Sequence, residues 1–146
     1  MRRFAFRLER VLELREYDEK AAEAALGEKT AACSRLTLAL EANARASVEA
    51  ARERFRPGSV ASDHRAGELY ADRLSQERER LLKALAAAEL EREKARADYL
   101  EATKARRLVT KLREREEAVY YKAVAREETK MMDDLAAGAH ARADAH

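Results

Sequence analysis

The histidines and cysteines, side chains that often bind a metal ion or, for cysteine, act as a nucleophile, number three and one in this sequence. His64 falls among turn-forming residues, whereas His140 and His146 lie near the carboxyl terminus. Their spacing matches no set of metal ligands, and no histidine is expected near Cys33 to generate a thiolate. The phosphate-binding patterns GxGxxG and GxxxxGKS/T do not occur either. We therefore expect no metal, no cofactor and no enzymatic activity.

Charged side chains are abundant but nearly balanced, with 30 basic and 28 acidic residues and a net charge of +2. Most of them are expected to form solvated helix faces. Two basic clusters depart from this balance. They consist of Lys104, Arg106, Arg107, Lys111, Arg113 and Arg115, and of Arg2, Arg3, Arg7, Arg10 and Arg15. They are either ordinary helix surface or a site for an acidic partner. Nucleic acid is not the expected partner and stays a minor option, because no aromatic platform or groove-reading motif accompanies the charges.

The segment from Val119 to Leu135 is a second candidate for binding. It carries tyrosines at 120 and 121 and methionines at 131 and 132. Apolar residues on a helix without a partner favour a docking surface, and methionine packs adaptably against varied surfaces. Self-association of two chains through this segment is the alternative interpretation.

Helices must position both features. Charged residues make up 40% of the chain and aromatic residues 5%, with four glycines and one proline, which is typical of a coiled coil. The one convincing break contains Pro57 and Gly58, and Ser62 or Asp63 is expected to cap the helix that follows. The predicted elements of this single domain over residues 1–146 are a helix over 4–55, a turn over 56–63, a helix over 64–135 and a frayed tail over 136–146.

Each predicted helix carries a narrow apolar seam with spacings of three, four and seven residues. In the first it consists of Leu8, Leu12, Ala22, Leu26, Cys33, Leu36 and Leu40, and in the second of Leu74, Leu81, Ala88, Ala95, Ala102 and Val109. A narrow seam needs a partner helix, because it cannot bury itself. The fold class is therefore all-α: two long helices forming an antiparallel coiled-coil hairpin, with the second helix projecting beyond the first.

The register of this hairpin follows from its turn. Folding near residue 60 pairs positions whose numbers add up to about 121. The predicted pairs include Leu12 with Val109, Leu26 with Ala95, Cys33 with Ala88, Leu36 with Leu85 and Leu40 with Leu81. The same register places Arg15 beside Arg106 and Lys29 beside Arg92, so these like charges must splay outward or find acids. From about Val119 onward, the second helix has no partner within the chain.

Location follows from simple features of the sequence. A single cysteine fits a reducing compartment. Charges at Arg7, Glu9 and Arg10 interrupt any apolar signal region, and no run approaches the roughly 18 apolar residues of a membrane span. We expect a cytoplasmic protein with no transmembrane segment.

Two stretches of the chain resemble the FliJ family of flagellar type III export proteins. The first is the opening stretch from Arg3 to Glu16, RFAFRLERVLELRE, which an alanine-rich acidic helix follows. The second is the closing stretch from Glu127 to Ala136, EETKMMDDLA, with its pattern of lysine, methionines and acids. Chain length and the central break agree with this resemblance, which covers nearly the whole chain.

The resemblance implies a non-catalytic stalk that is cytoplasmic and peripheral at the inner membrane through its partners. Proteins of this family insert into the hexameric ring of the export ATPase FliI, contact the export gate protein FlhA, and in some members bind export chaperones. By this analogy, the ATPase-binding residues are Phe4, Arg7, Leu8, Val11, Arg113, Tyr120, Arg126, Lys130 and Met131. The gate-binding residues are Leu40, Tyr70, Leu74 and Leu81. The first helix has Ala46, Val48 and Ala50 where the family sometimes has tyrosines before the turn.

Three functional hypotheses remain open at this point. The first is the export stalk, for which charge reversal at Arg7, Arg113 and Arg115 is expected to abolish stimulation of the ATPase. An equivalent stalk of a virulence type III secretion system is a variant of it. The second is a self-associating coiled-coil scaffold, which predicts a stable oligomer. The third is a nucleic-acid binder, which predicts an affinity that falls steeply with salt.

Overall fold

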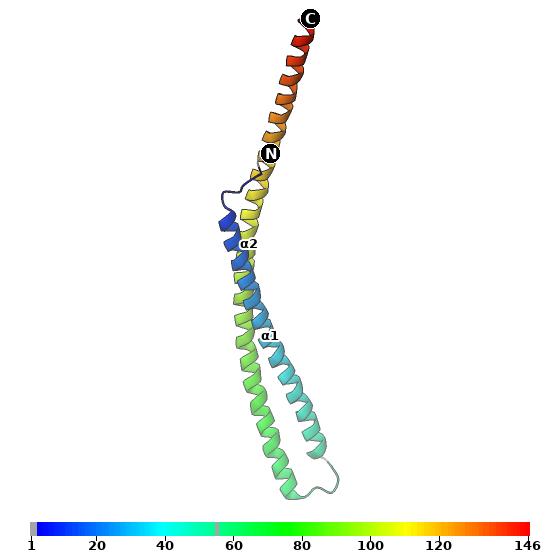
Figure 1. The fold of residues 1–146 in the computed structure, drawn as a ribbon. Helices are drawn as coiled ribbons and strands as arrows, with labels where there is room; N and C mark the ends of the chain where they lie inside the picture. Colours follow the sequence, from blue (N-terminus) through cyan, green and yellow to red (C-terminus); the bar gives the residue numbers. More distant parts are fainter. Residues whose placement is uncertain (1–2, 55) are drawn as a thin grey trace. The chain divides into compact units, whose positions relative to one another are not determined.

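Two α-helices make up the fold in the computed structural model, which describes residues 3–54 and 56–146 (Figure 1). Helix α1 spans Glu9–Arg54 and helix α2 spans Ala61–Asp144. The described residues contain no strand, and the two helices pack against each other as a hairpin. The prediction of an all-α helical hairpin is therefore confirmed.

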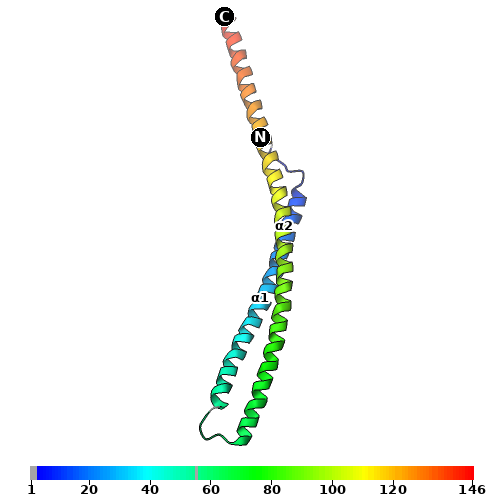
Figure 2. The same cartoon turned by 180° about the vertical axis from the view of Figure 1, so that it is seen from behind.

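Internal contacts divide the chain into two compact units. Unit 1 comprises Met1–Glu19 and Ala102–His146, and unit 2 comprises Lys20–Glu101. Each unit thus contains a segment of both helices. In unit 2, the segments of α1 and α2 run side by side in both views and are joined by the turn (Figure 2). Within the described residues, neither helix is apolar enough over a sufficient length to cross a membrane.

The buried residues of unit 2 confirm part of the predicted seam. Cys33, Leu74 and Ala95 are each less than one tenth exposed, at 4%, 7% and 8%. One polar residue interrupts this apolar seam. Asn43 is 5% exposed, and its Nδ2 donates a hydrogen bond to the Leu74 carbonyl oxygen at 3.0 Å. Its Oδ1 is also buried and has no hydrogen-bond partner. An asparagine in such a seam fixes the register of the helices at a cost in stability.

Replacing Asn43 with leucine is therefore expected to raise the free energy of unfolding by about 1 kcal/mol, because it removes a buried polar oxygen without a partner. Urea denaturation followed by circular dichroism measures this change. Ala44→Leu is the matched control, because Ala44 is exposed and the same side chain added there should leave stability nearly unchanged. A lower stability of Asn43→Leu would contradict this role of Asn43.

The turn between the helices is built from local hydrogen bonds. Gly58 has a φ of 90°, a left-handed conformation that glycine adopts without strain. Ser59 Oγ donates to the Arg56 carbonyl oxygen at 2.9 Å. Helix α2 then begins at Ala61, and the backbone N–H of Val60 donates to Asp63 Oδ2 at 3.4 Å. Asp63 thus caps the start of the helix from its third position, by accepting from the residue before the helix. The prediction of a cap from Asp63 is confirmed in this form, but neither Ser62 nor Asp63 precedes the helix as the N-cap residue.

Three predicted boundaries also differ from the structure. Helix α1 begins at Glu9 rather than Phe4. Residues 3–6 are not helical, and Phe6 among them is buried. Its predicted end at Phe55 lies outside the described residues. Helix α2 begins at Ala61 rather than His64. The tail over 136–146, predicted to fray, is helical through Asp144. Alanine is the strongest helix former and recurs throughout this tail, which offsets the roughly 1 kcal/mol that a glycine such as Gly138 costs in a helix.

Candidate functional site

An aromatic cluster in unit 1 fastens the residues before α1 to helix α2. The Phe4 ring lies 6.5 Å from that of Phe6 and 5.6 Å from that of Tyr120, centroid to centroid. The Tyr120 ring in turn meets that of Tyr121 edge to face at 5.4 Å. Phe6 is only 8% exposed, and Leu12, one turn into α1, is 3% exposed. The aromatic cluster therefore determines which part of α2 faces the amino-terminal segment.

Two ion pairs join the helix segments of unit 1. Arg113 Nη1 lies 3.5 Å from Glu9 Oε1, and the Arg106 side chain donates a hydrogen bond to the Glu19 carboxylate. Arg15 instead lies 3.9 Å from Asp18 on its own helix. The predicted layer of like charges between Arg15 and Arg106 is thus resolved, because each arginine has an acidic neighbour. Arg106 and Arg113 therefore form their ion pairs within the hairpin.

Other cations form an outer basic stripe on α2, which we define as Arg107, Lys111, Arg115, Lys122, Arg126 and Lys130. All six are exposed, and in the described part of the chain none of them makes an ion pair. They follow one another at intervals of four, four, seven, four and four residues. Like charges four residues apart destabilise a helix by about 0.2–0.5 kcal/mol per pair. The outer basic stripe contains several such pairs, so local helix stability does not explain it.

Beyond the aromatic cluster, α2 exposes large apolar side chains. Tyr121, the outer member of that cluster, is 52% exposed, and three residues within the closing stretch, Met131, Met132 and Leu135, are each about two thirds exposed. The described residues of the amino-terminal segment reach Tyr120 through Phe4. We call residues 121–135 the exposed segment. Large apolar side chains exposed together are typical of a surface that another molecule covers.

The residues predicted to bind the ATPase divide into two groups. Phe4, Leu8, Arg113 and Tyr120 are half-buried in unit 1, where they contribute to its own packing. Arg7, Val11, Arg126, Lys130 and Met131 are exposed. The second group is therefore the one available to a partner.

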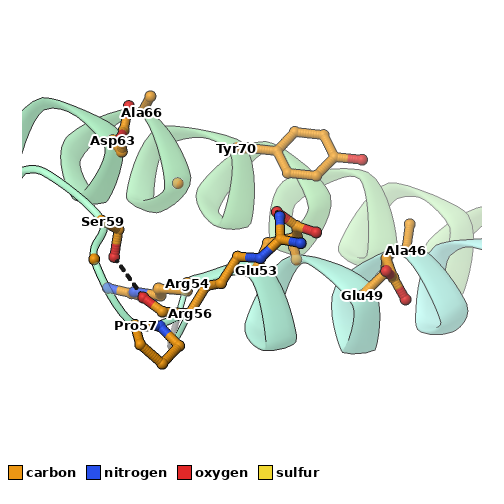
Figure 3. Close-up of a pocket in the computed structure, with 13 residues that line it drawn as sticks. Ala46, Glu49, Glu53, Arg54, Arg56, Pro57, Ser59, Asp63, Ala66 and Tyr70 are labelled. Carbon is orange, nitrogen blue, oxygen red and sulfur yellow. Dashed lines mark hydrogen bonds and ion pairs between the residues drawn. The ribbon is translucent and has the colours of Figure 1, made fainter.

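The residues predicted to bind the gate lie in unit 2, and most of them face its seam. Leu74 is buried and Leu40 and Leu81 are half-buried, whereas Tyr70 is 43% exposed. Tyr70 lines an open cavity of about 760 Å³ beside the turn, and Figure 3 shows its ring extending from α2 across from Glu49 and Glu53 of α1. The lining of this cavity also includes four small residues: Ala46, Ala50, Ala66 and Gly67. Tyr70 is the predicted gate residue with the most accessible side chain.

The histidines and the cysteine are not part of the outer basic stripe, the exposed segment or the lining of this cavity. Nε2 of His64 lies 3.4 Å from Ser59 Oγ beside the turn, and His140 is exposed on the last turns of α2. Cys33 is buried in the seam. In the ranges that the structure describes, no three His, Cys, Asp or Glu side chains come together in a way that could hold a metal ion.

Sequence reasoning missed three structural residues. Asn43 follows Leu40 at the seam spacing of three residues, and this spacing could have identified it as a buried polar position. Thr103, which is 9% exposed, immediately follows the predicted seam residue Ala102. The burial of Phe6 had no comparable signal, because Phe6 is not three, four or seven residues from a predicted seam residue.

Comparison with known protein families gives one informative match. The model of a family described as flagellar FliJ protein matches residues 4–145. No curated protein and no solved structure matches the chain.

Proposed function

Because the chain belongs to the flagellar FliJ protein family, whose members are associated with type III export, we propose that it is a non-catalytic stalk of the export apparatus. Unit 1 inserts into the ring of the hexameric export ATPase FliI, and the stalk couples this ATPase to the export gate protein FlhA. The protein acts at the cytoplasmic face of the membrane, where its partners hold it.

The exposed segment is the observation that carries this proposal. Met131, Met132 and Leu135 are each about two thirds exposed on a regular helix. Burying a large apolar side chain contributes about 1.5–3 kcal/mol, so three of them on one short stretch provide enough free energy for specific docking. The nearby cations Arg126 and Lys130 are exposed as well, and they would complement an acidic rim around an apolar contact.

For the gate contact, Tyr70 is the strongest candidate. It is accessible beside the turn, whereas Leu74 is held in the seam by packing and by the Asn43 hydrogen bond to its carbonyl group. Tyrosine provides a large contact area with little loss of conformational entropy, and it is enriched at the centres of interfaces. Export chaperones are a further class of partner.

The proposal is tested with the cognate ATPase in a pull-down and an ATP hydrolysis assay. The double charge reversal Arg126→Glu and Lys130→Glu should weaken binding and reduce stimulation of hydrolysis by at least about 10-fold, a loss typical of interface residues that each contribute about 1 kcal/mol. Arg113 is a poor choice for this test, because reversing its charge also breaks its ion pair with Glu9.

The matched control reverses two exposed cations of unit 2, Arg73→Glu and Arg80→Glu, which change the net charge equally. It should stimulate hydrolysis like the unaltered protein. Full stimulation by the Arg126 and Lys130 variant, or equal loss in both variants, would remove the assignment of this surface to the ATPase.

A self-associating scaffold is the second candidate function, and the exposed segment favours it too. Two copies could cover each other's Met131, Met132 and Leu135, and light scattering would then show a stable oligomer without the ATPase. The equivalent stalk of a virulence secretion system has less support, because the matching family is described as flagellar.

A further inference from the structure

We infer that the outer basic stripe of α2 binds an anionic phospholipid surface directly. This inference does not depend on the proposed docking into the ATPase, although the two surfaces share Arg126 and Lys130. It concerns the face of α2 that carries Arg107, Lys111, Arg115, Lys122, Arg126 and Lys130.

Helix geometry aligns these six side chains on one face. At 3.6 residues per turn they fall within a sector of about 140° and extend over about 35 Å of helix. None of the glutamates between them, at positions 114, 116, 117, 127 and 128, falls within this sector. The seam-facing residues of the same stretch, including Thr103, Val109 and Tyr120, are buried or half-buried. The outer basic stripe therefore faces away from α1.

The pairing of the cations supports the same conclusion. On the seam side, Arg106 and Arg113 have glutamate partners. On the outer side, no cation of the stripe makes an ion pair within the described residues, and neighbouring cations repel one another. A surface with many anions would relieve this repulsion along the whole stripe at once.

The aliphatic residues in the same sector favour a lipid surface over a nucleic acid. Leu108 and Val119 are 71% and 69% exposed, and Leu112 is 38% exposed. Aliphatic side chains beside cations can enter the boundary between headgroups and acyl chains, as in helices that lie on membranes. A single-stranded nucleic acid would instead need aromatic side chains for base stacking, and this sector contains none. Clusters of four to eight basic residues on a helix are typical of anionic lipid binding.

Co-sedimentation of the full chain with vesicles tests this inference. The protein should bind vesicles of phosphatidylcholine with phosphatidylglycerol, should not bind phosphatidylcholine alone, and should dissociate as salt screens the charges. The triple variant Arg107→Gln, Lys111→Gln and Arg115→Gln should bind about 100-fold more weakly, since each cation near an anionic surface contributes about fivefold. Of these three residues, only Arg115 has a predicted role in stimulating the ATPase. The double variant Arg107→Gln and Lys111→Gln, which keeps Arg115 and should bind vesicles about 25-fold more weakly, therefore separates failure of this inference from failure of the proposed function.

The control variant Arg73→Gln, Arg80→Gln and Lys83→Gln has the same net charge, and its altered positions are exposed in unit 2 near Asp72 and Glu77. It should bind like the unaltered protein, and circular dichroism should show both variants equally helical. Absence of binding to the anionic vesicles would overturn the inference, as would equal loss in both variants. Tighter binding to duplex DNA or to polyglutamate than to vesicles at the same salt would assign the stripe to another class of partner and would also overturn it.

Discussion

Truncation of the chain after Tyr121 is expected to abolish stimulation of the export ATPase while leaving the hairpin folded. It removes residues 122–146, and with them Met131, Met132 and Leu135, whose side chains are exposed and make no contribution to the core of unit 1. The aromatic cluster of Phe4, Phe6, Tyr120 and Tyr121 remains complete. Helical content per residue and the unfolding midpoint should therefore change little.

The affinity for the ATPase should fall by at least about 100-fold, because losing two or more buried apolar anchors exceeds 2.7 kcal/mol. Titration of ATP hydrolysis with the truncated protein measures this loss. A truncation after Leu135 is the matched control, since it removes the helical tail but keeps the exposed segment. If the protein truncated at Tyr121 still stimulates hydrolysis fully, docking does not use the exposed segment.

The second large effect is expected for Leu12→Asp. Leu12 is 3% exposed, the lowest value among the buried apolar residues, and it packs in unit 1. Burying a carboxylate there without a partner is expected to cost about 3–5 kcal/mol, a large part of the total stability of a domain this size. The amino-terminal part of α1 should then separate from α2, which limited proteolysis would detect as cleavage within residues 3–19.

Leu14→Asp provides the control for this substitution. Leu14 lies on the same turns of α1 but is 56% exposed, so the same change of chemistry should alter stability by less than about 0.5 kcal/mol. Similar proteolysis of both variants would mean that the seam side of α1 is not what holds the amino-terminal segment.

Periodicity alone predicted the features that depend on local sequence. Leu12, Cys33, Leu74 and Ala95 were placed in the seam by their spacing, and all four are buried. The break at Pro57 and Gly58 likewise predicted the turn, because these residues restrict the backbone at their own positions. Seams and turns are encoded within a few residues, so they can be read without the partner helix.

Features that depend on distant residues could not be read in this way. The start of α1 at Glu9 follows from the packing of Phe4 and Phe6, and Phe4 meets Tyr120, a residue far along the chain. Arg113 looked like a free cation in a basic run, and only the structure shows its pairing with Glu9. The set of site residues predicted from the sequence was therefore too large. It included residues that hold unit 1 together as well as residues that a partner can reach.

The cavity beside the turn implies that protection of backbone amides from hydrogen exchange varies along unit 2. Its lining consists mostly of small, charged and polar residues, which provide few apolar contacts to hold the helix ends together there. Segments with low contact density open locally at a small free-energy cost. Amide hydrogens of residues 46–54 and 61–70 should therefore exchange with deuterium sooner than those near Cys33 and Ala95. Unit 2 would then loosen first at its turn, where Tyr70 is accessible, and a partner could capture that opened state without unfolding the seam.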